Sequence, residues 1–272
     1  MTGGLAILAG NGALPVELAA AHPDALCVVF DGVAHQLTGA VQTHRFERLG
    51  EMFAALREQG VTRIVMAGSM SRPPLDPTAL DPLMVSLAPR LMAAMQGGDD
   101  ALLRLVIAII EEQGFAVLGA HALLADLTAA PGLLAGPDPA ETDRSDMARG
   151  AAILAALSPH DVGQGCVVAG GLVLGVETLQ GTEFMLDAVA RTNPHLRRGQ
   201  KGVFIKAAKT GQDLRVDMPA IGPDTVAQAQ AAGLAGIAIQ AGRVMILERE
   251  RTLVALAEAG MFLIAEEFEA LS

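Results

Sequence analysis

The stretch that decides the fold of the first half is LAILAGNGALPVELAA, residues 5–20. Its apolar run Leu5–Ala9 is typical of a buried strand, and Pro15–Ala21 predicts a helix. The intervening Gly10-Asn11-Gly12 matches half of the glycine pattern of dinucleotide-binding loops, in which backbone N–H groups approach a phosphate at a helix N-terminus. The third glycine of that pattern would fall at Pro15 and is missing. A phosphate-binding loop and a tight structural turn therefore both fit the stretch, and a nicotinamide cofactor fits it less well.

Strand-like and helix-like runs continue to alternate up to about residue 121. This alternation predicts an α/β domain with a parallel, doubly wound sheet. Ligands of such sheets bind at the carboxyl ends of the strands, so we expect the loops at residues 10–13, 68–72 and 119–121 to line one crevice. The further predicted strands are Ala25–Phe30, Thr62–Ala67 and Ala116–Leu118, and the predicted helices are Leu49–Gln59, Leu83–Met95 and Ala101–Gln113.

A segment rich in proline and glycine, Thr128–Asp143, interrupts this alternation and is typical of a linker. We therefore divide the chain into a first domain at residues 1–127, a linker at residues 128–145 and a second domain at residues 146–272.

The second domain is predicted to be mixed α/β or α+β. Gly170-Gly171 joins two strand-like runs, Cys166–Ala169 and Leu172–Glu177, and predicts a hairpin. Further strands are expected at Val203–Ala207 and Leu214–Val216. The order of strands in this domain cannot be derived from the pattern.

Composition and charge exclude several classes of protein. Hydrophobic residues make up 51% of the 272 residues, which supports buried cores and excludes a disordered chain. The net charge of −11 and the absence of Trp and Tyr argue against a nucleic-acid partner. No apolar run reaches the roughly 18 residues of a membrane span, and no basic segment followed by an apolar one opens the chain. We expect a cytoplasmic protein.

Several acidic and basic residues are candidates for phosphate or metal chemistry, each beside a structural alternative. Asp99 and Asp100 either cap a helix or hold a cation such as Mg²⁺. Lys206 and Lys209 are either solvated charges at a strand edge or phosphate contacts. Asp217 either pairs with Arg215, or it binds a metal or activates water.

Other patterns are weaker. Glu177 and the Gly181-Thr182-Glu183 segment fit a strand end and a capped helix start. The six histidines show no zinc-binding spacing, and no serine-nucleophile motif is present. From the residues alone, the prediction is an α/β protein with a phosphate-binding crevice.

The phrases themselves resemble those of the LpxI family, the UDP-2,3-diacylglucosamine pyrophosphatases. The resemblance covers essentially the whole chain, and its phrases follow the family order. They are LAGNGALPVEL (8–18), AGSMSRP (67–73), GDDALLR (98–104), GAH (119–121), DVGQG (161–165), GLVLGVE (171–177), GTE (181–183), RVDMP (215–219) and AGLAGI (232–237).

The resemblance implies a Rossmann-like UDP-binding first domain and a second domain that holds the diacylglucosamine phosphate, with the substrate between them. It implies Mg²⁺-assisted attack of water on the sugar-side phosphorus, which gives UMP and lipid X during lipid A synthesis. It also implies a homodimer with peripheral contact at the inner face of the inner membrane of a Gram-negative cell. Asp217 matches the catalytic aspartate, and Asp217 and Asp99 are the candidate metal ligands. The implied substrate contacts are Gly10, Asn11, Gly12, Ala13, Ser69, Asp99, Asp100, His121, Thr182, Lys206 and Lys209.

The chain departs from the family pattern at three of its positions, where the family has glycine, asparagine and glutamate. At these positions this chain has, in the same order, Asn11, Ser69 and Gln240. Asn tolerates left-handed backbone and can keep the turn, Ser69 has a shorter reach towards uridine, and Gln240 lacks the charge of a metal ligand. Two rival functions stay open: a non-catalytic carrier of UDP-lipid, and a dinucleotide-dependent oxidoreductase.

Overall fold

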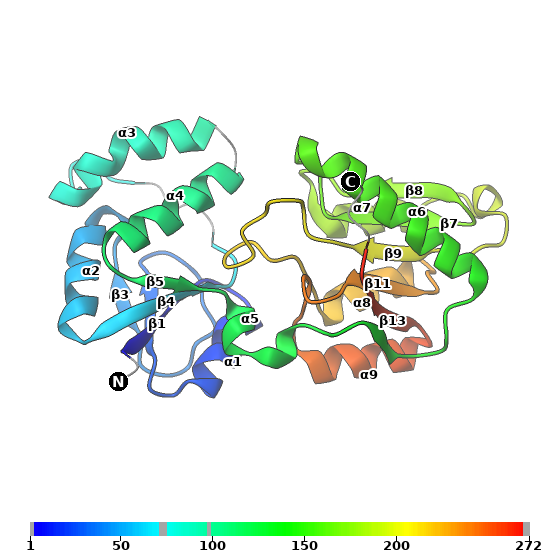
Figure 1. The fold of residues 1–272 in the computed structure, drawn as a ribbon, viewed down its shortest axis with the longest axis horizontal. Helices are drawn as coiled ribbons and strands as arrows, with labels where there is room; N and C mark the ends of the chain where they lie inside the picture. The colour runs from blue at the N-terminus through cyan, green and yellow to red at the C-terminus, as the bar shows by residue number, and fades with distance from the viewer. Residues whose placement is uncertain (1–2, 71–74, 97–98, 269–272) are drawn as a thin grey trace. The chain divides into compact units, whose positions relative to one another are not determined.

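The computed structural model describes residues 3–70, 75–96 and 99–268, with residues 99 and 100 described by their backbone only. The chain forms two compact units. The N-terminal unit contains Met1–Ala125 together with Asp213–Asp217, and the C-terminal unit contains Asp126–Gln212 and Met218–Ser272. Each unit has its own sheet and its own helices (Figure 1). The predicted class, a parallel α/β domain followed by a mixed one, is confirmed.

The N-terminal unit is built on a parallel sheet of five strands in the order β3-β2-β1-β4-β5. Strand β3 was not expected from the sequence, because its three residues are polar and show no apolar pattern. The strands are β1 (Gly4–Ala9), β2 (Leu26–Phe30), β3 (Gln42–His44), β4 (Val61–Ala67) and β5 (Ala116–Leu118).

Helices cover this sheet and bury its apolar side chains. Met52, Phe53, Leu87 and Ile110 come from three helices and pack with strand residues such as Ile64 in one core. In Figure 1, α3 and α4 lie on one side of the sheet and α1 on the other. The helices are α1 (Ala13–Ala21), α2 (Leu49–Glu58), α3 (Pro82–Gln96), α4 (Asp99–Glu112) and α5 (Ala120–Leu123), with the 3₁₀ turn η1 (Phe46–Arg48). A second 3₁₀ turn, η2 (Ala125–Leu127), begins at the last residue of the first stretch of this unit and continues into the C-terminal unit.

The C-terminal unit is built on a mixed sheet of six strands in the order β6-β13-β11-β9-β7-β8. Strands β9, β11 and β13 are parallel, whereas β6 and the β7–β8 hairpin run antiparallel to their neighbours. The strands are β6 (Gly132–Ala135), β7 (Gly165–Ala169), β8 (Leu172–Val176), β9 (Val203–Lys206), β11 (Gly236–Gln240) and β13 (Phe262–Glu266), and β10 (Ala220–Ile221) pairs separately with β12 (Met245–Ile246).

Alternate residues of these strands enter two different cores, as the period of a strand requires. Phe204 joins the core formed with α7, α8 and α9, whereas its neighbours Val203 and Ile205 join the core formed with α6. No helix in the described ranges is both long and apolar enough to cross a bilayer. The helices are α6 (Glu141–Leu157), α7 (Gly181–Ala190), α8 (Pro223–Ala231) and α9 (Arg249–Ala259), with 3₁₀ turns η3 (Ser158–His160) and η4 (Pro194–Arg197).

Two segments differ from the pattern that the sequence suggests. Residues 128–145, expected as a linker, contain β6 and the first residues of α6, and β6 pairs with β13. The strand predicted at Leu214–Val216 is wrong, because these residues form a turn. The carboxylate of Asp213 accepts the backbone N–H of Arg215 at 3.1 Å, and such a local side-chain bond competes with strand pairing.

Buried Asp81 ties two helices of the N-terminal unit together. Its carboxylate accepts the backbone N–H groups of Gly50 at 2.6 Å, Glu51 at 3.3 Å and Met84 at 2.8 Å. Asp81→Ala would leave these donors without their partner, so we expect a loss of roughly 2–3 kcal/mol of unfolding free energy. Urea unfolding followed by circular dichroism measures it. The control is exposed Asp24→Ala, and equal midpoints for the two variants would contradict the role of Asp81.

Candidate functional site

The N-terminal sheet changes the direction of its strand order between β1 and β4. Strands β2 and β3 extend from β1 on one side, and β5 extends from β4 on the other. In α/β sheets, the ligand crevice lies outside the carboxyl ends of the strands at such a point. The loops that follow β1 and β4 therefore form the first candidate site.

These two loops contact each other through their backbones. The N–H of Asn11 donates to the carbonyl of Ser69 at 2.7 Å, and the N–H of Ser69 donates back at 2.9 Å. A Cβ on Gly10 would lie 2.3 Å from the Ser69 oxygen, and a Cβ on Gly68 would lie 2.6 Å from the Asn11 oxygen. No side chain fits at either position. The loops expected at one crevice are thus neighbours at residues 10–13 and 68–70; residues 71 and 72 lie outside the described ranges.

Helix α1 begins at this contact. Its N-cap residue is Gly12, no side chain caps it, and its first turn contains no acidic residue. A Cβ on Gly12 would meet no atom of the described residues within 4 Å. The first N–H groups of a helix lack partners within it, and the helix dipole favours negative charge there. This helix start is suited to a phosphate group.

The segment Asp213–Asp217 belongs to the same unit and is held by Arg215. The guanidinium of Arg215 donates to Asp213 at 2.9 and 2.7 Å and to Glu111 of α4 at 2.7 Å. The hydrogen bonds from Arg215 lower the pKa of the Asp213 carboxyl below its usual range. Val216 packs against the N-terminal core, so both ion pairs and an apolar contact fix the segment that carries Asp217.

His121 lies beside this segment. A Cβ on Gly119, the residue that follows β5, would lie 2.4 Å from the His121 ring and 3.2 Å from the Arg215 backbone. The Nδ1 atom of His121 is buried without a hydrogen-bond partner among the described residues. Asp217 is half-buried, and its N–H donates to the Asp213 carbonyl at 3.2 Å. The structure therefore brings the loop of His121 and the segment of Asp217 to the carboxyl end of β5.

The C-terminal unit has a second cluster, centred on Lys206. This residue ends β9 and is 5% exposed. Its ammonium donates to the Glu177 carboxylate at 3.1 Å and to the Thr182 hydroxyl at 2.5 Å. Thr182 lies in the first turn of α7, and Glu177 directly follows β8. A buried charge requires such partners, so the structural alternative of a solvated edge lysine is wrong for Lys206.

The loop after β9 is fixed by polar side chains from other parts of the C-terminal unit. Ala208 N–H donates to the Gln240 amide oxygen at 3.1 Å, and Thr210 N–H donates to the Ser158 hydroxyl at 2.6 Å. Lys209, between them, pairs with Asp161. Gln240 therefore holds this loop through its neutral amide oxygen, which accepts a hydrogen bond. This role requires no metal ion.

A Mg²⁺ ion at this site would have to be held by few carboxylates. The residues described contain no group of three or more His, Cys, Asp or Glu side chains that could hold a metal ion. Asp99 and Asp100 begin α4, but their side chains lie outside the description. A cation held mainly by phosphate oxygens and water needs only one or two carboxylates. Half-buried Asp217 fits that requirement.

Comparison with known proteins identifies the family of both units. Residues 4–127 match the LpxI N-terminal domain, and residues 130–264 match the LpxI C-terminal domain. The chain belongs to the LpxI family. It is 36% identical over 271 residues to the UDP-2,3-diacylglucosamine pyrophosphatase LpxI of Caulobacter vibrioides, and the match covers 96% of each chain. The resemblance seen in the sequence is confirmed.

The candidate residues carried over from the LpxI family fall into two groups. The described ones in the N-terminal unit are Gly10, Asn11, Gly12, Ala13, Ser69, His121 and Asp217, and those in the C-terminal unit are Thr182, Lys206 and Lys209. Asn11 does not use left-handed backbone, because positive φ at described non-glycine residues occurs only at Asp161, Arg198 and Glu248. Its side chain accepts from exposed Gln36 at 3.4 Å.

Sequence reasoning missed two partners. It paired Arg215 with Asp217, whereas the structure shows Arg215 in ion pairs with Asp213 and Glu111. The Asp213-x-Arg215 spacing is a turn signal that could have indicated the first of them. It also left Glu177 as a residue at a strand end, and no local signal links Glu177 to a lysine 29 positions away.

Gly68→Ala tests the loop contact. We expect it to cost roughly 2–4 kcal/mol of unfolding free energy, because φ is +85° and the added Cβ meets the Asn11 carbonyl. Gly32→Ala is the matched control, since φ there is +76° and nothing lies within 4 Å. Chemical unfolding of both variants measures the difference. If Gly32→Ala costs as much as Gly68→Ala, the close approach contributes nothing.

Asp213→Asn tests the ion pair through its pH dependence. The folded-state pKa of Asp213 is lowered, so its stabilising contribution is present above the unfolded pKa of about 3.9 and is lost as pH falls through the folded value. We expect the unfolding free energy of the wild type to exceed that of Asp213→Asn by roughly 1 kcal/mol at neutral pH. This difference in unfolding free energy should disappear in strong acid. Unfolding curves across the pH range measure it. A gap that is constant with pH would contradict the assignment, and Asp24→Asn provides the control.

Proposed function

We propose that this chain hydrolyses the pyrophosphate bond of UDP-2,3-diacylglucosamine and releases UMP and 2,3-diacylglucosamine 1-phosphate (lipid X) in lipid A biosynthesis. The observation that carries the proposal is the match to a named pyrophosphatase over 96% of both chains. Both domains of the family are represented in the chain. The two candidate phosphate-binding groups described above support it, because the substrate contains two linked phosphates.

The nucleotide end of the substrate is assigned to the N-terminal unit. The start of α1 offers N–H groups to a phosphate, and the first turn of the helix contains no acidic residue. The contact between the loops of Gly10 and Gly68 fixes that helix start, so little rearrangement is required on binding. Ser69 and His121 follow the neighbouring strands and are candidates for contacts with the uridine.

The glucosamine phosphate is assigned to the C-terminal unit. Lys206 supplies a buried ammonium, and Thr182 supplies a hydroxyl in the first turn of α7. A helix N-terminus adds favourable dipoles for an anion. Because Glu177 already neutralises Lys206, the pair is held in place before a phosphate arrives. Lys209 on the adjacent loop provides a second ammonium.

The reaction assigned to these groups is attack of water on the sugar-side phosphorus. A bond forms between the water oxygen and phosphorus, and the bond to the bridging oxygen breaks, so UMP leaves with that oxygen. Asp217 orients the water or takes its proton, and Lys206 stabilises the phosphate charge. Mg²⁺, bound with Asp217 and Asp99 as candidate ligands, would neutralise pyrophosphate oxygens. A cytoplasmic homodimer is part of the same proposal.

Asp217→Asn is expected to abolish hydrolysis, because the amide neither accepts a proton nor binds a cation as strongly as the carboxylate. Binding of UDP-2,3-diacylglucosamine should be kept. Mass spectrometry of UMP and lipid X in the presence of Mg²⁺ measures turnover, and Asp224→Asn, an exposed carboxylate in α8, is the control. Turnover of Asp217→Asn near that of wild type would overturn the role of Asp217. Intact substrate after incubation with wild type would instead favour a carrier.

Lys206→Met is expected to lower kcat/KM roughly 10²- to 10³-fold, since it removes a charged donor aimed at the reacting phosphate. The substrate is presented in detergent micelles, and exposed Lys201→Met is the control. Circular dichroism checks that Lys206→Met folds, because Glu177 then lacks its ion-pair partner. A change in KM with unchanged kcat would assign Lys206 to substrate binding alone.

A further inference from the structure

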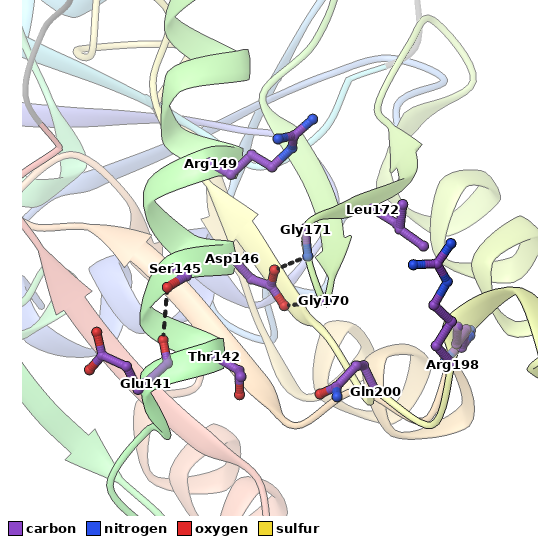
Figure 2. A pocket seen from close by; sticks show the side chains of 11 residues that line it. Glu141, Thr142, Ser145, Asp146, Arg149, Gly170, Gly171, Leu172, Arg198 and Gln200 are labelled. Carbon is purple, nitrogen blue, oxygen red and sulfur yellow. Dashed lines mark hydrogen bonds between the residues drawn. The ribbon is translucent and has the colours of Figure 1, made fainter.

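The C-terminal unit contains a pocket of about 560 Å³ that the proposed reaction does not use. Its walls are one face of α6, the Gly170-Gly171 turn and the chain from Arg197 to Gln200 (Figure 2). Gly165 lies opposite Lys206 at one end of the β7–β9 pair, and Gly170 follows the other end of β7. The pocket is therefore separate from the Lys206 cluster, and its volume lies in the range of small-molecule sites.

The buried carboxylate of the lining has a structural role. Asp146 is 2% exposed and accepts the N–H groups of Gly170 at 2.7 Å and Gly171 at 2.6 Å. Both glycines have positive φ, which fits a two-residue hairpin turn. Asp146 is thus engaged in holding the hairpin. The other acidic residue of the described lining, exposed Glu141, points away from the hairpin in Figure 2.

Two arginines of the lining can receive a ligand. Within the described residues, no hydrogen bond or ion pair engages the guanidinium of Arg149 or Arg198. In Figure 2 these two side chains lie on either side of Leu172. Residues 191–201, which include Arg198, hold four of the 19 Lys and Arg residues and no Asp or Glu, although the net charge is −11. An anion that enters the pocket therefore meets two unpaired positive charges.

The wall that carries Arg198 is fixed before a ligand arrives. The neighbouring Arg197 donates to the carbonyl of Ala232 at 2.6 Å and to that of Val189 in α7. Arg198 itself has a φ of +54°, in the left-handed region that favours glycine over residues with a Cβ. The backbone thus holds an arginine at a position where glycine would be less strained. A fixed wall lowers the ordering cost of binding.

The remaining side chains of the lining indicate what the anion is attached to. Thr142 and Ser145 carry hydroxyls, and Gln200 carries an amide. The Ser145 hydroxyl donates to the Glu141 carbonyl at 3.0 Å, so its oxygen can still accept a hydrogen bond. Among the described residues that line the pocket none is aromatic, so a nucleobase would have no ring on which to stack. These groups suit a hydroxylated carbon skeleton.

We propose that this pocket binds a small soluble polyol phosphate, a phosphate monoester on a hydroxylated carbon skeleton. Arg149 and Arg198 bind the phosphate, and Thr142, Ser145 and Gln200 bind the hydroxyls. Guanidinium groups match phosphate oxygens in pairs of hydrogen bonds. A phosphate monoester carries close to two negative charges at neutral pH, about −1.5 to −2, and so balances both arginines. A phospholipid diester carries a single charge and balances only one of them.

Isothermal titration calorimetry with sn-glycerol 3-phosphate tests the proposal without any turnover. We expect saturable binding to one site on the wild-type chain. Arg149→Gln with Arg198→Gln should weaken this affinity roughly tenfold or more, because charge-assisted hydrogen bonds are lost. Circular dichroism checks the fold of the double variant. Absence of binding to the wild type, or equal affinity of the double variant, would overturn the proposal.

The matched control is Arg191→Gln with Lys201→Gln. It removes the same charge from the same basic segment, at residues outside the lining. This control should bind sn-glycerol 3-phosphate like the wild type. Equal weakening in the two double variants would reduce the effect to general electrostatic attraction and overturn the site.

Arg198→Gly separates binding from folding. Glycine relieves the left-handed backbone at this position, so the variant should have a Tm equal to or above that of the wild type. Its affinity for sn-glycerol 3-phosphate should still fall roughly tenfold. Wild-type affinity in Arg198→Gly would remove Arg198 from the site and contradict the proposal.

Other ligands distinguish the polyol phosphate from other anions. Glycerol should not bind, and sulfate and succinate should bind more weakly than sn-glycerol 3-phosphate. Equal or tighter binding of sulfate or succinate would overturn the assigned ligand class. Phosphatidylglycerol vesicles present a related group as a diester. Vesicles that retain the wild type but not Arg149→Gln with Arg198→Gln would assign the arginines to a lipid surface and overturn the soluble ligand.

Two further variants separate this pocket from the proposed reaction. Lys206→Met should bind sn-glycerol 3-phosphate like the wild type, and loss of binding there would place the ester at the Lys206 cluster and overturn the pocket. Hydrolysis of substrate in detergent micelles by Arg149→Gln with Arg198→Gln should equal that of the wild type. A failure of the proposed reaction therefore shows in the hydrolysis assay and leaves the calorimetric result unaffected.

Discussion

Two backbone segments meet at the carboxyl edge of the N-terminal sheet with no space for a side chain between them. The carbonyl of Ser69 lies too close to Gly10, and that of Asn11 too close to Gly68, for either glycine to carry a Cβ. This contact joins the loops of the two central strands, β1 and β4, at the point where the strand order changes direction. The start of α1 is positioned by the same contact, so the direction of its free N–H groups follows from it. Glycine is required here by geometry before any ligand is considered.

The two candidate phosphate sites depend on different physics. At the start of α1 the positive potential comes from backbone dipoles, so no charged side chain has to be buried. At Lys206 it is a full ammonium, and the cost of burying it is offset by Glu177 and Thr182 at hydrogen-bonding distance. Local groups of this kind explain how a chain with a net charge of −11 can hold an anionic substrate.

The parts of the fold that were predicted correctly have strong local signals. The strand, glycine turn and helix at residues 5–20 and the hairpin at Gly170-Gly171 each combine an apolar run with turn residues. Strand β3 lacks an apolar run and was missed. Leu214 and Val216 alternate like strand residues, yet Val216 is partly buried against the helix-covered core of the N-terminal unit. That alternation arises from a tertiary contact, which a local pattern cannot distinguish from sheet pairing.

The site residues show the same division between local and long-range information. The family phrases supplied a list of candidates, but their contacts depend on residues far apart in the chain. Lys206 meets Glu177 across the β9–β7–β8 part of the sheet, and Gln240 reaches Ala208 from the end of β11. The side chains of Asp99 and Asp100 lie outside the described part, so their assignment to Mg²⁺ still rests on the resemblance.

The segment Asp213–Asp217 has a consequence for how the two units are separated. The chain passes from the N-terminal unit to the C-terminal unit, returns for these five residues and then leaves again. A gene fragment that stops at residue 127 would encode the whole parallel sheet and yet lack Arg215 and Val216, leaving Glu111 without its ion pair and the core without one of its apolar contacts. The halves are therefore not independent modules that could be exchanged by recombination at a single site. The carboxylate assigned to catalysis is encoded with one half and packs with the other.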